Sequence, residues 1–200
     1  MKKMKIILTI IIIVALASSL YYYFLKSNET YPYVVLQKFQ DFEIRKYDKA
    51  LFSSVELNAT DYESTPRQGF NILAGFIFGA NDKNEKISMT TPVLMNMGKK
   101  TTVQFLIPSK YGKYDLPMPQ NSAIEFKEVP PRIVAVIQYS GWNNDEKMKK
   151  YSSILTNLLI KEGIKHKGEF TFMGYNAPFD FINRRNEIMV ELTDYRTINE

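Results

Sequence analysis

Two helix-like segments, each set among β-like segments in the same order, constrain the fold of this chain most strongly. The first begins with Thr65, an N-cap residue, and Pro66; apolar residues then recur at helical spacing until Gly79. The second begins near Asn144, has acidic residues in its first turn, and ends at Gly163. Because each helix follows a β segment and precedes others, the chain is predicted to be an α+β protein.

Segments rich in β-branched and aromatic residues predict the strands, at 34–39, 42–47, 50–57, 103–107, 133–139, 170–175 and 188–192. The turn-compatible pair Gln40 and Asp41 separates the first two. The halves 31–107 and 123–193 share the order strands, helix, strands, which indicates an internal duplication. We therefore expect an antiparallel sheet or barrel that carries two helices.

The formal net charge of +5 originates at the N-terminus. Four of the 26 basic residues lie among the first 26 positions, where no acidic residue occurs: Lys2, Lys3, Lys5 and Lys26. The remaining 22 basic residues face 21 acidic residues, so the rest of the chain is nearly neutral. Nucleic-acid-binding domains are usually basic, and the sequence therefore predicts no nucleic-acid partner.

Residues 6–25 form an apolar run after three lysines. A helix of this length spans roughly 30 Å, the thickness of the hydrocarbon core of a bilayer. The run predicts an N-terminal membrane helix with the C-terminal domain outside the cytoplasm. The alternative is a cleaved signal peptide and export, since Ala15 and Ala17 have the spacing of a cleavage site. We expect an anchor or signal segment at 1–26, a linker at 27–30 and a domain at 31–200.

The residues that carry common catalytic chemistry are few. Cys is absent, and the single histidine, His166, lies between a predicted helix and a predicted strand. No nucleophile elbow, phosphate-binding loop or paired-histidine motif occurs, so an ordinary hydrolase or redox enzyme is disfavoured. One histidine does not make a zinc site, and no metal ligand is predicted.

Several motifs together resemble the SOUL haem-binding protein family. They are FEIRKY at 42–47, GFNILAGFIFGAN at 69–81, ISMTTPV at 87–93, GYNAP at 174–178 and NRRNEI at 183–188. The resemblance covers the chain from residue 31 to about residue 193. It implies a pseudo-two-fold, distorted antiparallel β-barrel with two helices, and non-covalent binding of haem or a related tetrapyrrole without catalysis.

A haem site needs an apolar wall and a basic rim for the two propionates. The first helix supplies a candidate wall, made of Phe70, Leu73, Ala74, Ile77 and Phe78, although the same stripe has the spacing of a core-packing face. Candidate partners for carboxylates are Arg67, Arg184 and Arg185. We expect binding through the face of the ring with weak axial ligation or none, so metal-free porphyrin should bind almost as well as haem. Glu43, Arg45 and Glu187 are expected to form an ion pair between the halves.

The predicted function is a membrane-tethered buffer, carrier or scavenger of haem or another tetrapyrrole. Three alternatives stay open at this point. The first is a module that binds another amphiphilic planar ligand, the second is a structural or interaction protein, and the third is an enzyme that acts on a tetrapyrrole.

Overall fold

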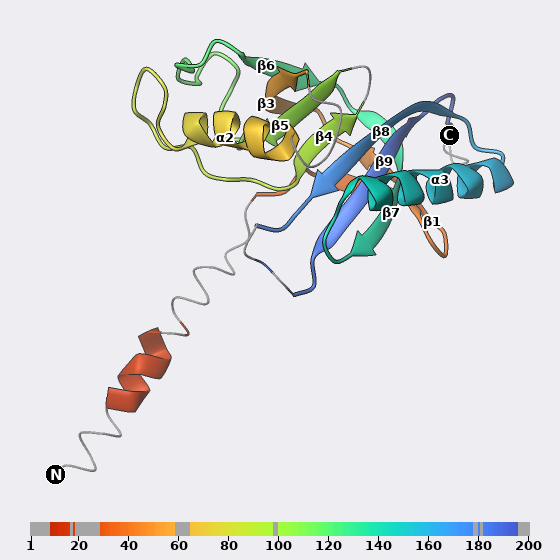
Figure 1. Cartoon of the computed structure of the whole chain (residues 1–200), viewed down its shortest axis with the longest axis horizontal. Helices are drawn as coiled ribbons and strands as arrows, with labels where there is room; N and C mark the ends of the chain where they lie inside the picture. The colour runs from red at the N-terminus through yellow and green to blue at the C-terminus, as the bar shows by residue number, and fades with distance from the viewer. Residues whose placement is uncertain are drawn as a thin grey trace.

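The computed structural model describes residues 9–16, 18, 29–58, 65–97, 100–177, 180 and 182–195 (Figure 1). Within these residues, nine strands form one antiparallel sheet in the order β1-β2-β7-β9-β8-β4-β5-β3-β6. The strands are β1 (Tyr33–Lys38), β2 (Glu43–Tyr47), β3 (Ala50–Leu57), β4 (Val93–Met97), β5 (Thr101–Leu106), β6 (Ile124–Val129), β7 (Arg132–Ser140), β8 (His166–Gly174) and β9 (Arg185–Leu192). The domain helices are α2 (Thr65–Ile77) and α3 (Asp145–Lys161).

The strand order repeats in the two halves of the sheet. The unit β3-α2-β4-β5 has the sheet order β3-β5-β4, and the unit β7-α3-β8-β9 has the order β7-β9-β8. The two units meet where β4 pairs with β8, with Leu94 opposite Met173. Each unit also receives a strand from the other, because β2 pairs with β7 and β6 pairs with β3. The strand order thus follows the duplication expected from the sequence.

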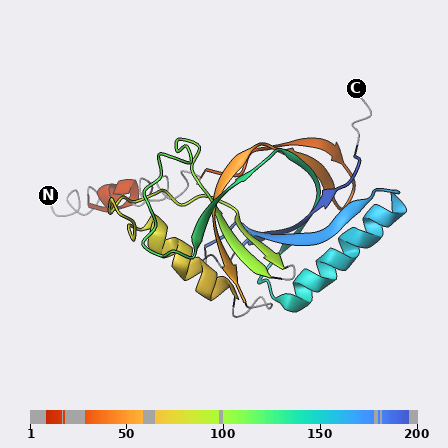
Figure 2. The same cartoon turned by 90° about the horizontal axis from the view of Figure 1, so that it is seen from above.

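The sheet curls into a distorted barrel (Figure 2), and its strand order leaves two edges. β1 and β6 form its two edges and do not pair with each other. Each edge has features that discourage further pairing: the register of β1 shifts between Val35 and Gln37, and β6 carries Glu125, Lys127 and Glu128. The predicted α+β class, with a distorted, barrel-like antiparallel sheet, is confirmed.

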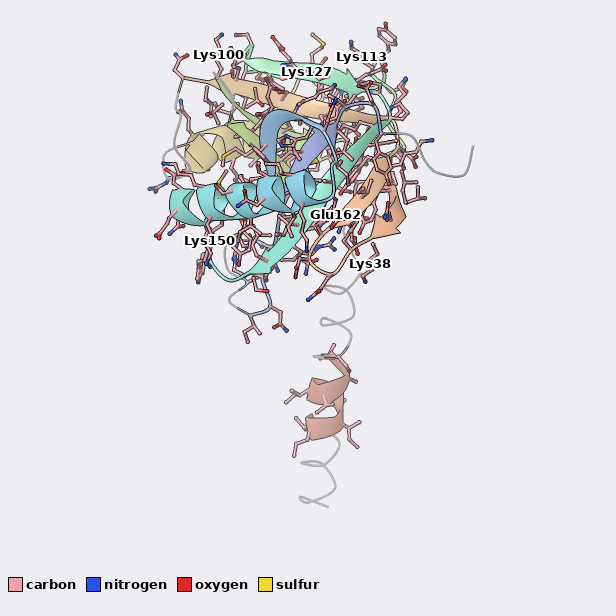
Figure 3. All side chains as sticks on the ribbon, turned by 90° about the vertical axis from the view of Figure 1, so that its right-hand side faces the viewer. Lys38, Lys100, Lys113, Lys127, Lys150 and Glu162 are labelled. Atoms are coloured by element: carbon pink, nitrogen blue, oxygen red, sulfur yellow. The ribbon has the colours of Figure 1, made fainter. Side chains whose placement is uncertain are left out.

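The local signals for α3 are confirmed, and Gly79 lies just past the end of α2 with a φ of 114°. The predicted N-cap role of Thr65 concerns a side chain outside the described ones, and it stays a prediction. The side chain of Asn144 caps α3 by accepting a hydrogen bond from the backbone N–H of Lys147 at 2.9 Å. Gly163 follows the end of α3 with a φ of 69°, a left-handed conformation that suits glycine. Lys150 and Glu162 belong to the charged surface of this helix (Figure 3).

The core has two parts, one on each face of the sheet. α2 and α3 cover one face and bury Leu73, Leu155 and Leu159 against it. Alternate strand residues point the other way, so that Leu94 and Met173 join the second cluster, which includes Tyr31, Tyr47 and Phe52. The sheet therefore presents a helix-covered face and a concave face.

The N-terminal segment differs from its prediction. No helix among the described residues is long and apolar enough to span a membrane. The predicted single-pass topology, with the C-terminal domain outside the cytoplasm, is therefore wrong. Residues 1–8, 17 and 19–28 lie outside the described residues, and they include the first half of the predicted linker at 27–30.

Candidate ligand-binding cleft

A cavity of about 280 Å³ lies where the two halves of the sheet meet, on the helix-covered face. Its apolar lining comes from α2, β4, β5 and β8: Phe70, Val93, Met95, Val103 and Phe172. Glycine at position 69 brings α2 close to the sheet, because a Cβ there would lie 2.6 Å from Cγ2 of Val103. The close contact between helix and sheet thus places Phe70 at the cavity.

Polar residues line the cavity near the end of β8. Between β4 and β8, Met95 lies opposite Phe172 and Val93 lies opposite Gly174. Between β8 and β9, Gly174 lies opposite Asn186. Beyond that pair lie Asn176 and Arg184, and the segment before α3 adds Trp142 and Asn143. The lining is therefore apolar along β4 and β8 and polar past the end of β8, which suits an amphiphilic ligand.

Arg184 lies over the ring of Trp142, with its Cζ 4.3 Å from the ring centroid. Its Nη1 donates to the backbone carbonyls of Ala177 at 3.0 Å and Asp180 at 2.7 Å. Carbonyl partners hold the guanidinium in place without neutralising it. Arg184 therefore brings a positive charge to the polar end of the cavity.

The structure brings two of the eight sequence-predicted residues, Phe70 and Arg184, to this cavity. Leu73, Ala74 and Ile77 are buried in the core between α2 and the sheet, as a core-packing stripe would be. Arg67 and Phe78 are exposed and do not line the cavity, and Arg185 pairs with Glu187. Contact of each residue with a ligand stays a prediction.

The predicted ion pair of Glu43, Arg45 and Glu187 is confirmed. Glu187 is fully buried and accepts hydrogen bonds from Arg45 at 2.9 and 3.2 Å and from Arg185 at 2.7 Å. Arg45 also donates to Glu43 at 2.8 Å. Because β2 belongs to one half and β9 to the other, this network joins the halves.

Two tyrosines beside this network resist ionisation. Burial, and then the charge of Glu187, raises the pKa of Tyr47 to about 12. The same two causes raise the pKa of Tyr175 above the usual range of a phenol, and its hydroxyl donates to Glu187 at 2.8 Å. Tyr47 and Tyr175 therefore remain neutral hydrogen-bonding partners at physiological pH.

His166 starts β8 and does not line the cavity; its Nδ1 accepts a hydrogen bond from the backbone N–H of Gly168 at 3.1 Å. In the described part of the chain, no cluster of three or more potential ligand residues could hold a metal ion. Sequence reasoning missed Trp142, Asn143, Asn176 and Asn186 in the lining. They come from loops and strand ends, and no local pattern marks such residues as neighbours.

A family model described as "SOUL heme-binding protein" matches residues 28–191, and the chain belongs to this family. A protein named Heme-binding protein 2 from Mus musculus is 30% identical over 156 residues, which cover 74% of this chain and 76% of that protein. Heme-binding protein 1 from Bos taurus is 27% identical over 177 residues, covering 81% and 91% of the two chains.

Two solved structures share the fold at low sequence identity. The C-terminal domain of EcmrR has a TM-score of 0.60 at 12% identity and covers 77% of this chain and 98% of its own. A hydrolase from Listeria innocua has a TM-score of 0.56 at 8% identity and covers 78% and 94%. At this level of identity the likeness concerns the fold alone.

Proposed function

We propose that this chain binds haem or a related tetrapyrrole non-covalently in the cavity between α2 and residues 142–143, and serves as a buffer, carrier or scavenger. One observation carries the proposal: a member of a family named for haem binding has a cavity with apolar walls and a positively charged end where its two halves meet. The proposed role is binding without catalysis. We propose residues 31–200 as the folded domain.

The residues of the cavity suit a flat, apolar ring with acidic side groups. Phe70, Phe172 and Trp142 offer aromatic surface for ring contacts, and Arg184 offers a charge for a propionate. The volume of about 280 Å³ is at the low end of ligand pockets, which run from about 300 to 1,000 Å³. The cavity therefore accommodates part of a macrocycle, and the rest would remain accessible to solvent.

Binding through the organic ring explains how a chain without a suitably placed histidine holds such a ligand. The one sulfur ligand in the described lining, Met95, is buried and has the ordinary role of a core-filling side chain. Bound haem would supply a redox-active iron, whereas the residues of this chain hold the ring and its charge. Metal-free porphyrin should therefore bind nearly as well as haem.

A titration of the full chain with haemin and then with metal-free protoporphyrin tests the proposal. Trp142, the single tryptophan, lines the cavity and reports binding through quenching of its fluorescence. We expect saturable quenching and a shifted Soret band, with affinities for the two ligands within about threefold, a difference below about 1 kcal/mol. Absence of saturation by either ligand at low micromolar concentration contradicts the proposal.

The small volume favours one second candidate, a planar amphiphile smaller than haem. Anilinonaphthalene sulfonate is a suitable probe, because it combines an aromatic body with an anionic group. Saturable binding of this probe without any binding of porphyrin would favour the second candidate over the first.

A further inference from the structure

Two hydrogen-bond donors on the cavity lining have no partner within the described residues. They are Nδ2 of Asn143 and Nε of Arg184, and both atoms are buried. Buried polar groups are nearly always hydrogen-bonded, so two such donors on residues that line one cavity suggest an acceptor that a ligand would bring.

The side-chain amide of Asn143 already uses its oxygen in a hydrogen bond within the protein. Its Oδ1 accepts a hydrogen bond from the hydroxyl of Tyr139 at 2.5 Å. The ring of Tyr139 stacks on Tyr151 of α3, with centroids 4.0 Å apart and an interplanar angle of 7°. The stacked ring fixes the hydroxyl, and the hydroxyl fixes the amide, so the group that remains for a ligand is a donor.

Arg184 is held in a comparable way. Nη1 is occupied by the carbonyls of Ala177 and Asp180, and the guanidinium plane is supported by the ring of Trp142. Nε remains as a buried donor on a cationic group. A charged acceptor forms a stronger hydrogen bond with such a donor than a neutral acceptor does.

The other two amides of the lining already have partners. Nδ2 of Asn186 donates to the carbonyl of Gly141 at 2.7 Å. Nδ2 of Asn176 donates to Oδ2 of Asp180 at 3.5 Å, and its Oδ1 accepts from the backbone N–H of Arg185 at 2.7 Å. The unpartnered buried donors of the described lining are thus confined to Asn143 and Arg184.

We propose that Asn143 and Arg184 form a carboxylate subsite, in which one anionic carboxylate of the ligand accepts hydrogen bonds from both side chains. This inference rests on the proposed function and adds to it the chemical group that the cavity selects. Asn143 is the specificity-determining residue. Its amide nitrogen donates hydrogen bonds and accepts none, so it binds only a ligand group that accepts a hydrogen bond. Arg184 supplies the charge.

The test compares mesoporphyrin with its dimethyl ester on the full chain, by quenching of Trp142. The wild-type chain should bind the acid about tenfold or more tightly than the ester, as expected for hydrogen bonds to a charged group. Asn143→Asp keeps the size of the side chain and an acceptor for Tyr139, but replaces the donor with an anionic oxygen. We expect about a tenfold or greater loss for the acid and at most a threefold change for the ester.

Arg184→Lys is the second variant, since it keeps the charge and removes Nε. It should lower the affinity for the acid more than that for the ester. Asn157→Asp and Lys83→Gln are matched controls, because both residues are exposed and lie outside the lining. Neither control should change the ratio of the two affinities, and the melting temperatures of all variants establish that they fold.

The possible failures are distinguishable. Equal binding of acid and ester by the wild-type chain, unchanged in Asn143→Asp and Arg184→Lys, overturns the subsite and leaves tetrapyrrole binding in place. If neither compound binds, the proposed function fails and the subsite fails with it.

Discussion

At the residue scale, Glu187 accounts for much of the connection between the two halves of the sheet. Its carboxylate lies on β9, has no exposed surface, and accepts hydrogen bonds from Arg45 of β2, from Arg185 and from Tyr175. Two cations thus share one buried anion, and Arg45 has a second partner in Glu43. Removing one member of a buried ionic cluster leaves its partners desolvated and unpaired, which is costly.

We therefore predict that Glu187→Gln destabilises the protein by about 3–5 kcal/mol in chemical unfolding experiments. Glutamine keeps the size of the side chain but removes the charge that Arg45 and Arg185 share. Glu125→Gln is the control, because its ion pair with Lys127 is largely exposed and should contribute less than about 1 kcal/mol. Equal stability of Glu187→Gln and the wild-type protein would mean that the network contributes little to the fold.

At the scale of the element, α2 contributes both to the core and to the cavity wall. Leu73 is fully buried between the helix and the sheet, whereas Phe70 is partly buried, packs against Phe105 and lines the cavity. Phe78 lies just beyond the helix and is 63% exposed. One apolar stripe thus contains residues with three different environments.

These environments predict different effects of truncation. Leu73→Ala should cost about 2–5 kcal/mol of stability and leave the porphyrin affinity of the folded protein unchanged. Phe70→Ala should lower porphyrin affinity about tenfold with a smaller loss of stability, because it removes surface that faces the cavity. Phe78→Ala should change neither. Thermal unfolding and porphyrin titration of each variant measure both quantities.

An unchanged porphyrin affinity in Phe70→Ala would place the ligand outside the cavity described above. A fall in affinity in Phe78→Ala or Arg67→Ala would place the ligand against these two exposed residues, which the sequence predicted as part of the site. The two results therefore separate the proposed cavity from that other surface.

At the scale of the whole molecule, the exchange of strands makes each half depend on the other. β2 of the first half pairs with β7 of the second, and β6 of the second half pairs with β3 of the first. At the centre of the sheet, β4 of the first half pairs with β8 of the second. Separating the halves would break all three pairings and expose the residues of both core clusters.

We predict that the domain unfolds in one cooperative step. Trp142, which lies in the second half, and the far-ultraviolet circular dichroism of the whole chain should show the same transition midpoint in denaturant. Two separate midpoints would instead mean that the halves are independently stable units.

The sequence by itself determined the features that depend on neighbouring residues. Caps and helical spacing identified α2 and α3, because signals such as Asn144, Gly163 and Gly79 act within one turn of a helix end. Alternating β-branched and aromatic residues identified seven of the nine strands of the described sheet. The joint order of the motifs indicated the family, and with it the ion pair of Arg45 and Glu187.

Local sequence patterns did not predict the secondary structure of segments whose structure depends on their surroundings in the fold. β6 carries charged residues at an edge of the sheet, and β4 contains methionine and asparagine, so neither has the composition of a typical strand. The apolar composition of residues 6–25 predicted a membrane helix, which the described residues do not form.

The tertiary structure alone decided that the sheet stays open and where its cavity lies. Phe70, Trp142 and Arg184 are far apart in the sequence, and they meet because β4 pairs with β8 between the helices. Arg184 precedes β9 and lies at the cavity, whereas Arg185 is the first residue of β9 and pairs with Glu187. Local preferences act over a few residues, whereas a binding site is assembled by long-range contacts, and its composition therefore depends on the complete fold.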